Sequence, residues 1–253
     1  MERRRTERMK KNATQPPASD SIAPRTLAVD IGGTGIKTII LDPDGKPLTQ
    51  RERIPTPPRA TPKKVMAIIE QMARQQGEFD RVSVGFPGVV KDGKLLTAFN
   101  LGPGWKKFDF EKALSRQLMR PVRIANDADV QGLGSVSGRG IELLITLGTG
   151  VGSSLFVNGH LAHLEMGHHP FRKGRTYEDE LGNAALRKKG PKKWNKHLLE
   201  AIDILRATFC YDRLYIGGGN SKHIRPPLPA NVQLVSNIEG LLGGVMLWRE
   251  EAE

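Results

Sequence analysis

The sequence predicts a mixed α/β fold, and two features carry this prediction. An apolar strand, a glycine-rich turn and a second strand follow one another at residues 27–41, and the same design returns at residues 142–157. Elsewhere, short apolar runs typical of buried strands alternate with stretches whose apolar residues recur at helical spacing. A chain of 253 residues fits one large domain or two smaller ones.

The clearest helix is expected at residues 61–77. Thr61 is a suitable N-cap, Pro62 suits the first turn, and Gly77 is a suitable end. The other helices are expected at residues 108–118, 126–133, 194–209 and 239–249, and further single strands at residues 81–85, 122–125, 213–216 and 232–235.

The first hairpin combines an apolar strand, the carboxylate Asp30 and the turn Gly32-Gly33-Thr34-Gly35. Because glycine has no Cβ, the backbone N–H groups of such a turn can approach an anion closely. Asp30 could hold a divalent cation or position its water. A plain tight hairpin is the alternative, and this segment alone leaves both open. No helix is signalled directly after the glycines, so neither a P-loop nor a dinucleotide-binding fingerprint fits.

The second hairpin carries the turn Gly148-Thr149-Gly150-Val151-Gly152. A phosphate-bearing ligand held between two lobes needs one glycine loop from each, so the repetition favours phosphate binding over two ordinary hairpins. A third glycine turn, Gly217-Gly218-Gly219-Asn220, follows the strand at residues 213–216 and suits close approach to an adenine, a ribose or a phosphate.

Asn126 and Asp127 follow the strand expected at residues 122–125. In open α/β sheets, ligands gather outside the carboxyl ends of strands. A carboxylate there is placed to take a proton from a hydroxyl nucleophile. The competing role is helix capping, because Asn126 or Asp127 could begin the helix that runs through Val130 and Leu133. For an isolated motif of this kind, helix capping is the default interpretation.

Three other polar side chains are candidates for ligand binding. Asn100 lies in a Gly/Pro-rich loop and has both a donor and an acceptor for a sugar hydroxyl, although spacing alone favours a role in holding its own loop. Glu165 and His168 could bind a metal or neighbouring hydroxyls of one ligand. His160 and His163 add no recognised zinc spacing, and a surface or structural role is usual for such a pair.

The net charge of +12 indicates an anionic partner. Part of the charge lies in residues 1–24, a charged and then Pro/Ser/Ala-rich segment expected to be a disordered, solubilising tail. The rest is concentrated at residues 172–196, beside the predicted phosphate loops, which favours a polyanion over a merely solvated basic face. The basic residues there are Arg172, Lys173, Arg175, Arg187, Lys188, Lys189, Lys192, Lys193 and Lys196.

Composition excludes several classes of protein. No apolar run reaches 18 residues, so no membrane span is expected, and the N-terminus lacks a signal segment. The single cysteine, Cys210, excludes an intramolecular disulfide framework and a multi-cysteine zinc cluster. A reducing, cytoplasmic location is the simplest interpretation.

Taken together, the motifs resemble the ROK sugar-kinase family from Leu27 to about Trp248. The matching stretches are DIGGTGIK (30–37), GFPGVV (85–90), FNLGPGW (99–105), NDAD (126–129), LGTGVG (147–152), EMGHH (165–169) and GGGN (217–220). The resemblance implies the two-lobed actin-like, ribonuclease-H-like ATPase fold with a central cleft. It implies a small N-terminal α/β lobe at residues 25–124, a large C-terminal α/β lobe at residues 125–237, and a closing helix at residues 238–253 packed back on the first lobe.

The resemblance also implies roles for individual residues. Asp127 would be the catalytic base that takes the proton from the sugar's 6-hydroxyl, and Asp30 would lie near Mg²⁺. Sugar hydroxyls would be bound by Asn100, Asn126, Glu165, His168 and, with looser spacing, Glu178. The phosphoryl donor would be held by Asp30, Gly32, Gly33, Thr34, Gly35, Lys37, Thr149, Gly150, Gly218 and Gly219.

The chain departs from most of the family after residue 169. Most members have a three-cysteine zinc cluster there, whereas this chain has PFRKGRTYEDELG at residues 170–182 and no such cysteines, so no zinc is expected. This stretch is similar to the polyphosphate-glucokinase branch, which phosphorylates glucose with inorganic polyphosphate and often with ATP as well. The basic residues expected to grip polyphosphate are Arg172, Lys173, Arg187, Lys188, Lys189, Lys192 and Lys193.

The expected function is therefore transfer of a phosphoryl group from polyphosphate to glucose, by an enzyme expected to be a homodimer. A strictly ATP-dependent glucokinase or mannokinase is the alternative among enzymes. A sugar-sensing ROK regulator would need an N-terminal helix-turn-helix, and the segment before Leu27 is too short and polar for one. A nucleic-acid partner is not expected, because the basic segment has few stacking rings besides Tyr177 and Trp194.

Overall fold

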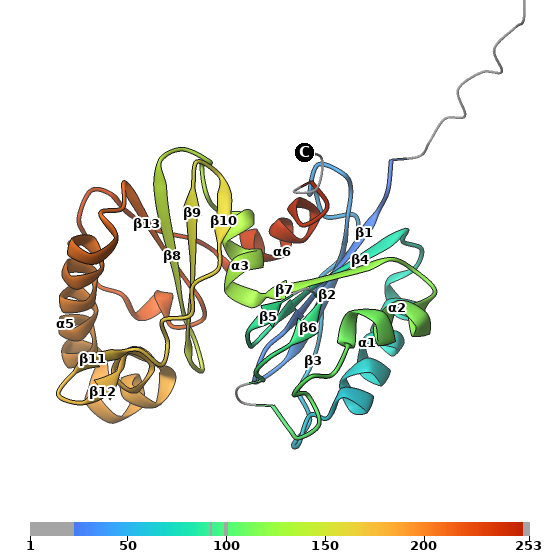
Figure 1. The fold of residues 1–253 in the computed structure, drawn as a ribbon, viewed down its shortest axis with the longest axis horizontal. Coiled ribbons are helices and arrows are strands. Elements are labelled where there is room, and N and C mark those ends of the chain that lie inside the picture. Colours follow the sequence, from blue (N-terminus) through green and yellow to red (C-terminus); the bar gives the residue numbers. More distant parts are fainter. Residues whose placement is uncertain (1–22, 92, 99–100, 250–253) are drawn as a thin grey trace, which may run out of the picture.

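The computed structural model describes residues 23–91, 93–98 and 101–249. The chain forms two lobes, each built around a five-stranded sheet, with two helices between them (Figure 1). Asn100 and residues 1–22 of the expected tail lie outside the described residues. Within the described ranges, no helix combines the length and apolar character that a membrane span requires.

The N-terminal sheet has the strand order β3-β2-β1-β4-β7. Strand β1 pairs antiparallel with β2 and parallel with β4, so the first glycine hairpin forms as the sequence predicts. A second, two-stranded sheet pairs β5 with β6. The strands are β1 (Thr26–Ile31), β2 (Ile36–Leu41), β3 (Glu52–Ile54), β4 (Arg81–Phe86), β5 (Val90–Lys91), β6 (Lys94–Leu95) and β7 (Val122–Asn126).

Side-chain alternation along β1 gives this sheet two different faces. Leu27 and Val29 point into a core shared with α1 (Pro62–Gln76) and α2 (Phe110–Leu118). Ala28 points to the opposite face, where it packs with Val245 of α6 (Asn237–Met246). Both faces are covered, which explains why the strand is an unbroken apolar run.

The C-terminal sheet has the order β10-β9-β8-β13-β14 and repeats this arrangement. Leu143 and Ile145 of β8 pack against the long helix α5, whereas Leu144 faces Ala128 of α3. The elements are α3 (Asp127–Leu133), β8 (Ile141–Leu147), β9 (Val151–Val157), β10 (His160–Ala162), β11 (Pro170–Arg172), β12 (Arg175–Thr176), α4 (Tyr177–Leu181), α5 (Asn183–Phe209), β13 (Arg213–Gly217), the 3₁₀ turn η1 (Ser221–His223) and β14 (Val232–Leu234).

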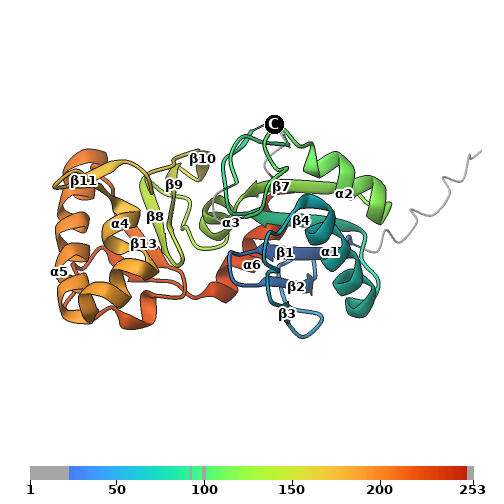
Figure 2. The ribbon, with the colours of Figure 1, turned by 90° about the horizontal axis from the view of Figure 1, so that it is seen from below.

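Helices α3 and α6 pack against each other between the lobes, each covering the inner face of one sheet (Figure 2). Their approach depends on Gly243, because a Cβ there would lie 1.7 Å from the carbonyl oxygen of Val130. Gly244 similarly lies close to Ser83 and Ala28. The base of the space between the lobes is therefore a close contact between two helices.

Three elements differ from the sequence prediction. Helix α5 begins at Asn183, well before the expected start at Trp194, because the chain continues past a non-helical Gly190 (φ 74°, ψ 161°) followed by Pro191. Strand β7 extends to Asn126, one residue beyond the strand expected at residues 122–125. The stretch at residues 170–182 folds as the β11–β12 hairpin followed by α4, with Phe171 stacked on Tyr177 at 4.7 Å.

Candidate active site

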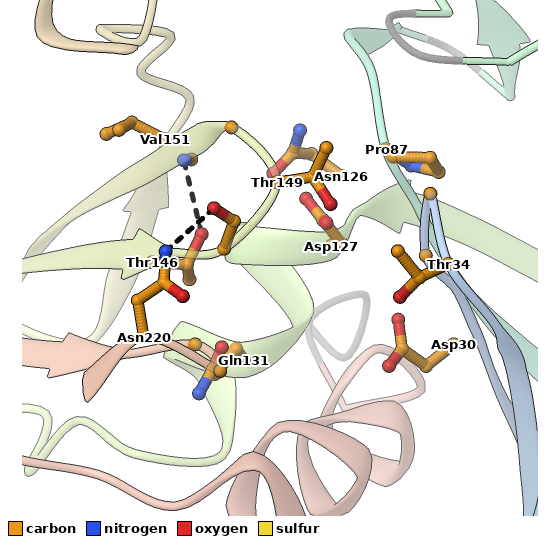
Figure 3. Close-up of a pocket in the computed structure, with 18 of the residues that line it drawn as sticks. Asp30, Thr34, Pro87, Asn126, Asp127, Gln131, Thr146, Thr149, Val151 and Asn220 are labelled. Atoms are coloured by element: carbon orange, nitrogen blue, oxygen red, sulfur yellow. Dashed lines mark hydrogen bonds between the residues drawn. The ribbon is translucent and has the colours of Figure 1, made fainter. Parts of the chain in front are cut away.

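A cleft of about 630 Å³ lies between the lobes and is lined from both of them. The N-terminal sheet contributes Asp30, Gly32, Gly33, Thr34 and Lys37, and the C-terminal lobe contributes the loop at residues 148–152 (Figure 3). The two glycine turns that the sequence singled out therefore open onto one cavity. Gly35 is not part of its lining: its carbonyl accepts from Gly32 N at 3.0 Å, and its Cα faces the Arg53 side chain.

Asp127 is the first residue of α3 and faces the cleft from its base (Figure 3). Burial and then the nearby charge of Asp30 raise the pKa of Asp127 to about 7, although a hydrogen bond from Ala128 N opposes this shift. Glu165 and Asp129 raise the pKa further. A carboxyl group with a pKa near neutrality is well suited to accept a proton from a hydroxyl group.

Asn126 caps α3, as the capping alternative predicted. Its Oδ1 accepts from Ala128 N at 2.8 Å and from Asp129 N at 3.3 Å, while its Nδ2 donates to Gly88 O at 3.0 Å. The acceptor is thus used within the protein, and one Nδ2 hydrogen is left for a ligand. Asn126 lines the cleft beside Asp127, so capping and ligand binding are compatible.

Glu165 and His168 lie on a turn that is fixed from β9. Ser153 Oγ donates to Leu164 O and accepts from Met166 N, both at 2.9 Å. The turn packs so closely that a Cβ on Gly167 would lie 2.3 Å from Val151 O. Burial raises the pKa of Glu165, which a hydrogen bond from Gly167 N partly offsets. Both Glu165 and His168 line the cleft.

Glu178, on α4, reaches the same cavity from the other side of the turn. Its backbone N–H donates to Gly167 O at 2.8 Å, and its carboxylate lies against Gly150, where a Cβ would be 2.2 Å from Oε2. Glu178 therefore joins the Glu165–His168 turn to the second glycine loop, and the lack of a side chain at Gly150 gives its carboxylate room in this position.

The second glycine loop is anchored through one carbonyl group. Gly148 O accepts from Asn183 N at 2.9 Å and from Asn220 Nδ2 at 3.0 Å. Asn220 N also donates to Leu147 O at 2.8 Å, so the third glycine turn packs on the second. The N–H groups of Gly148, Val151 and Gly152 already donate within the protein. Among the described loop residues, Thr149 and Gly150 are left to present N–H groups to an anion.

Lys37 lies opposite Asp30 on the paired strand, and its Nζ is 2.7 Å from Asp30 Oδ2. This ion pair lies at the N-terminal side of the cleft, across from Asp127. The Asp30 carboxylate is one possible ligand for a divalent cation. The described residues contain no group of three His, Cys, Asp or Glu side chains arranged to hold a metal ion without a substrate.

The predicted basic tract divides into separate groups. Arg187 lines the cleft, whereas most of the others surround a second cavity of about 440 Å³ among β11, β12, α4 and α5, here called the basic pocket. Lys192 is exposed and lines neither cavity. The basic pocket is lined by Arg172, Lys173, Arg175, Glu180, Lys188, Lys189, Lys193 and His197.

Glu180 organises the basic pocket. Its side chain is 5% exposed and pairs with Lys189, with His197 Nδ1 at 2.6 Å and with Arg175 at 3.6 Å. Burial would raise the pKa of Glu180, but the hydrogen bond and charge of Lys189, with His197 and Arg175, lower it overall. Lys189 is 10% exposed, so its charge is largely committed to Glu180.

The sequence profile of the ROK family matches residues 26–180, more than half of the chain. The chain belongs to the ROK family. Among curated relatives of this ROK protein, the polyphosphate glucokinase of Mycobacterium tuberculosis H37Ra is 29% identical over 242 residues, covering 87% of this chain and 89% of that protein. The polyphosphate glucokinase of Mycobacterium leprae is also 29% identical and covers 92% of this chain.

Solved structures show the same fold as this ROK protein. The inorganic polyphosphate/ATP-glucomannokinase from Arthrobacter sp. strain KM matches with a TM-score of 0.80 and 31% identity over 90% of this chain and 99% of that one. A ROK glucokinase from Streptomyces griseus, solved with glucose and AMPPNP, matches with a TM-score of 0.73 at 19% identity over 89% of this chain and 99% of that one. These matches confirm the predicted two-lobed, actin-like fold of ROK sugar kinases.

The sequence prediction missed several residues of this ROK protein's cleft. Lys222 and His223, on η1, line its C-terminal side together with Asn183, and Gln131 and Thr146 line its base. Lys222 follows the third glycine turn by only a few residues, which is a signal that could have marked it. Gln131 had no such signal, because it becomes part of the cleft only through the packing of α3.

Proposed function

We propose that the chain is a polyphosphate-dependent glucokinase, which transfers the terminal phosphoryl group of inorganic polyphosphate, and also of ATP, to the 6-hydroxyl of glucose. The observation that carries the proposal is the placement of Asp127, with its raised pKa, opposite two glycine loops in one interlobe cleft. Similarity to proteins named polyphosphate glucokinase and polyphosphate/ATP-glucomannokinase supports the choice of donor and acceptor.

In this proposal the sugar lies beside Asp127. Asn126, Glu165, His168 and Glu178 bind its hydroxyl groups, as does Asn100. Glu165 and Glu178 offer acceptors, and the free Nδ2 hydrogen of Asn126 offers a donor. The turn held by Ser153 fixes Glu165 and His168, so the hydroxyl groups meet preorganised partners and the 6-hydroxyl is directed at Asp127.

The donor's terminal phosphate lies between the loops at residues 32–34 and 148–150, where backbone N–H groups stabilise its charge. A bond forms between O6 of glucose and phosphorus as the bond from phosphorus to the rest of the donor breaks. The O6 proton passes to Asp127, and the donor leaves as an anion shorter by one phosphate. Positioning and charge stabilisation carry most of the catalysis of such transfers.

Mg²⁺ is the proposed cation, with Asp30 as its protein ligand. Kinase sites commonly hold Mg²⁺ through one or two carboxylates together with substrate phosphates, so a site with few protein ligands fits. The effect of Asp30 on the pKa of Asp127 also fits, because two carboxylates that repel each other favour a cation between the lobes. When bound, Mg²⁺ would neutralise charge on the transferred phosphate.

The rest of the polyphosphate chain is proposed to lie against basic residues of the C-terminal lobe, namely Arg187 at the cleft and the exposed cations of the basic pocket, Lys173, Lys188 and Lys193. Arg172 and Lys189 are paired with Glu200 and Glu180, so they shape this surface more than they supply free charge. The proposal includes a cytoplasmic location and a homodimer, and light scattering can test the dimer.

The test is a coupled assay for phosphorylated hexose, with polyphosphate and ATP compared at equal phosphoryl concentration. Glucose with polyphosphate is expected to give product. Mannose is included as an acceptor because the Arthrobacter protein is named a glucomannokinase. Absence of phosphorylated hexose with every donor and acceptor would overturn the proposal, whereas product from ATP alone would support a strictly ATP-dependent kinase.

A further inference from the structure

The cations that line the cleft differ in whether a carboxylate already neutralises them. Lys37 is paired with Asp30. Among the residues that the structure describes, Arg187 and Lys222 have no carboxylate within 4 Å. Both side chains are exposed, and both line the cleft. They are therefore uncompensated positive charges at the edge of the proposed donor site.

Both residues are placed by the same backbone group of the second glycine loop. Arg187 lies one helical turn, about 6 Å along α5, beyond Asn183, whose N–H donates to Gly148 O at 2.9 Å. Lys222 lies two residues beyond Asn220, whose Nδ2 donates to the same oxygen at 3.0 Å. The two cations therefore extend from a common anchor at the loop that would hold the transferred phosphate.

Asn195 then ties the two supporting elements together. Its Nδ2 donates to His223 O at 2.9 Å, and its Oδ1 accepts from Arg225 N at 2.8 Å. Asn195 lies on the part of α5 after the break at Gly190, whereas Arg187 lies on the part before it. The hydrogen bonds of Asn195 hold the turn that carries Lys222 against α5 before any ligand binds, which lowers the ordering cost of binding.

The chemistry of this end of the cleft matches phosphates better than a nucleoside. Within the described part of the lining there is no Phe, Tyr or Trp on which a base could stack, and Leu186 is the large apolar side chain near Arg187. An arginine and a lysine instead offer donors that suit phosphate oxygens. In a nucleoside triphosphate, ribose and base take the place of the fourth and later phosphates of a chain.

We infer, on the basis of the proposed function, that Arg187 and Lys222 bind the phosphates that follow the transferred one and so select a polyphosphate chain over a nucleoside triphosphate. Lys222 is a specificity-determining residue in this inference, and His223, half-buried on the same turn, completes that wall of the cleft. The acidic lining residues Asp30, Asp127, Glu165 and Glu178 belong to the part of the cleft proposed for transfer and for sugar binding.

The experiment measures direct binding of long-chain polyphosphate by isothermal titration calorimetry at several salt concentrations, alongside donor kinetics with polyphosphate and ATP. Lys222→Ala is expected to lower the slope of log Kd against log salt by somewhat under one unit. The variant makes one phosphate contact fewer, so its binding releases fewer counterions. The double variant Arg187→Ala/Lys222→Ala is expected to lower the ratio of kcat/KM for polyphosphate to kcat/KM for ATP by at least about 10-fold. Lys222→Arg is expected to restore most of the slope.

Lys64→Ala is the matched control, because Lys64 is an exposed lysine on α1 that does not line the cleft, and it removes the same net charge. Equal changes in slope for Lys64→Ala and Lys222→Ala would overturn the inference, as would equal losses with polyphosphate and ATP. The proposed function fails in a different way: the wild-type protein would then neither bind polyphosphate nor form phosphorylated hexose.

Discussion

Asp127 and Asp30 both line the cleft, and the charge of Asp30 raises the pKa of Asp127 (Figure 3). Asp127 begins α3 directly after β7, an edge strand of the first sheet, and Asp30 is the next-to-last residue of β1 in the same sheet. A Cβ on Gly85, the residue paired with Asp30, would lie 3.5 Å from the Cα of Asp127, so both carboxylates are positioned by one sheet. Positive charge introduced between the carboxylates would lower the pKa of Asp127 and favour its basic form.

Replacing Asp127 with Asn is expected to lower kcat about 10²–10⁴-fold, the usual contribution of a positioned general base. The amide keeps the size of the side chain, so the Kd for glucose should stay within about 3-fold of wild type. Steady-state kinetics and calorimetry of glucose binding measure the two quantities. Asp44→Asn, in the exposed turn after β2, is the control for loss of one carboxylate. Near-normal turnover in Asp127→Asn would remove Asp127 from the role of base.

The same substitution makes a prediction about stability. The folded-state pKa of about 7 lies above the unfolded value near 4, so the folded protein binds the extra proton and wild-type stability falls as pH rises between these values. An asparagine side chain does not titrate, so its contribution to the free energy of unfolding does not change with pH in this way. The stability advantage of Asp127→Asn over wild type should be larger at pH 8 than at pH 5 by about 2–3 kcal/mol. Urea unfolding at the two pH values measures it, and an advantage that does not change with pH would show that the pKa is not raised.

Much of the fold, and several residues of the cleft lining, could be predicted from local sequence. Each glycine hairpin follows an apolar run, and Asp127 follows the strand at residues 122–126, so composition and order alone locate them. The capping role of Asn126 was foreseen for the same reason, because its partners, Ala128 N and Asp129 N, are two and three residues away.

Features that depend on contacts distant in the chain could not be predicted. The Gly190-Pro191 pair has the signature of a helix end, yet buried residues on both sides, such as Leu186 and Trp194, hold α5 against one core. Lys189 looked like part of a uniform basic face. Its pairing with Glu180 depends on how α4 packs on α5, and no periodicity within either helix indicates it.

Gly243→Ala tests the contact between α3 and α6. The added Cβ would lie 1.7 Å from Val130 O, a backbone atom that cannot turn away, so the helices must separate. We expect a loss of about 1–3 kcal/mol in the free energy of unfolding, typical of overpacking. Gly244→Ala is the matched control, since its Cβ would meet Ser83 and Ala28 at 3.2 and 3.3 Å and should cost less. Chemical unfolding of the two variants measures this order, and a larger loss for Gly244→Ala would contradict the packing described.

Glu180→Gln tests the carboxylate at the centre of the basic pocket. The substitution leaves Lys189, His197 and Arg175 without their shared counter-charge, and breaking a buried ion pair from one side is costly, so we expect a loss of about 2–4 kcal/mol in the free energy of unfolding at pH 7. The pKa of Glu180 is lowered in the folded protein, so its stabilisation is present above the unfolded pKa and is lost as pH falls through the folded value. The difference in the free energy of unfolding between variant and wild type should therefore shrink below about pH 4.

Glu200→Gln is the matched control for Glu180→Gln. Glu200 is 38% exposed and, among the described residues, pairs only with Arg172, at 3.2 Å. Its replacement should therefore lower the free energy of unfolding by less than about 1 kcal/mol. Equal losses in the two variants at pH 7 would show that Glu180 does not organise the pocket.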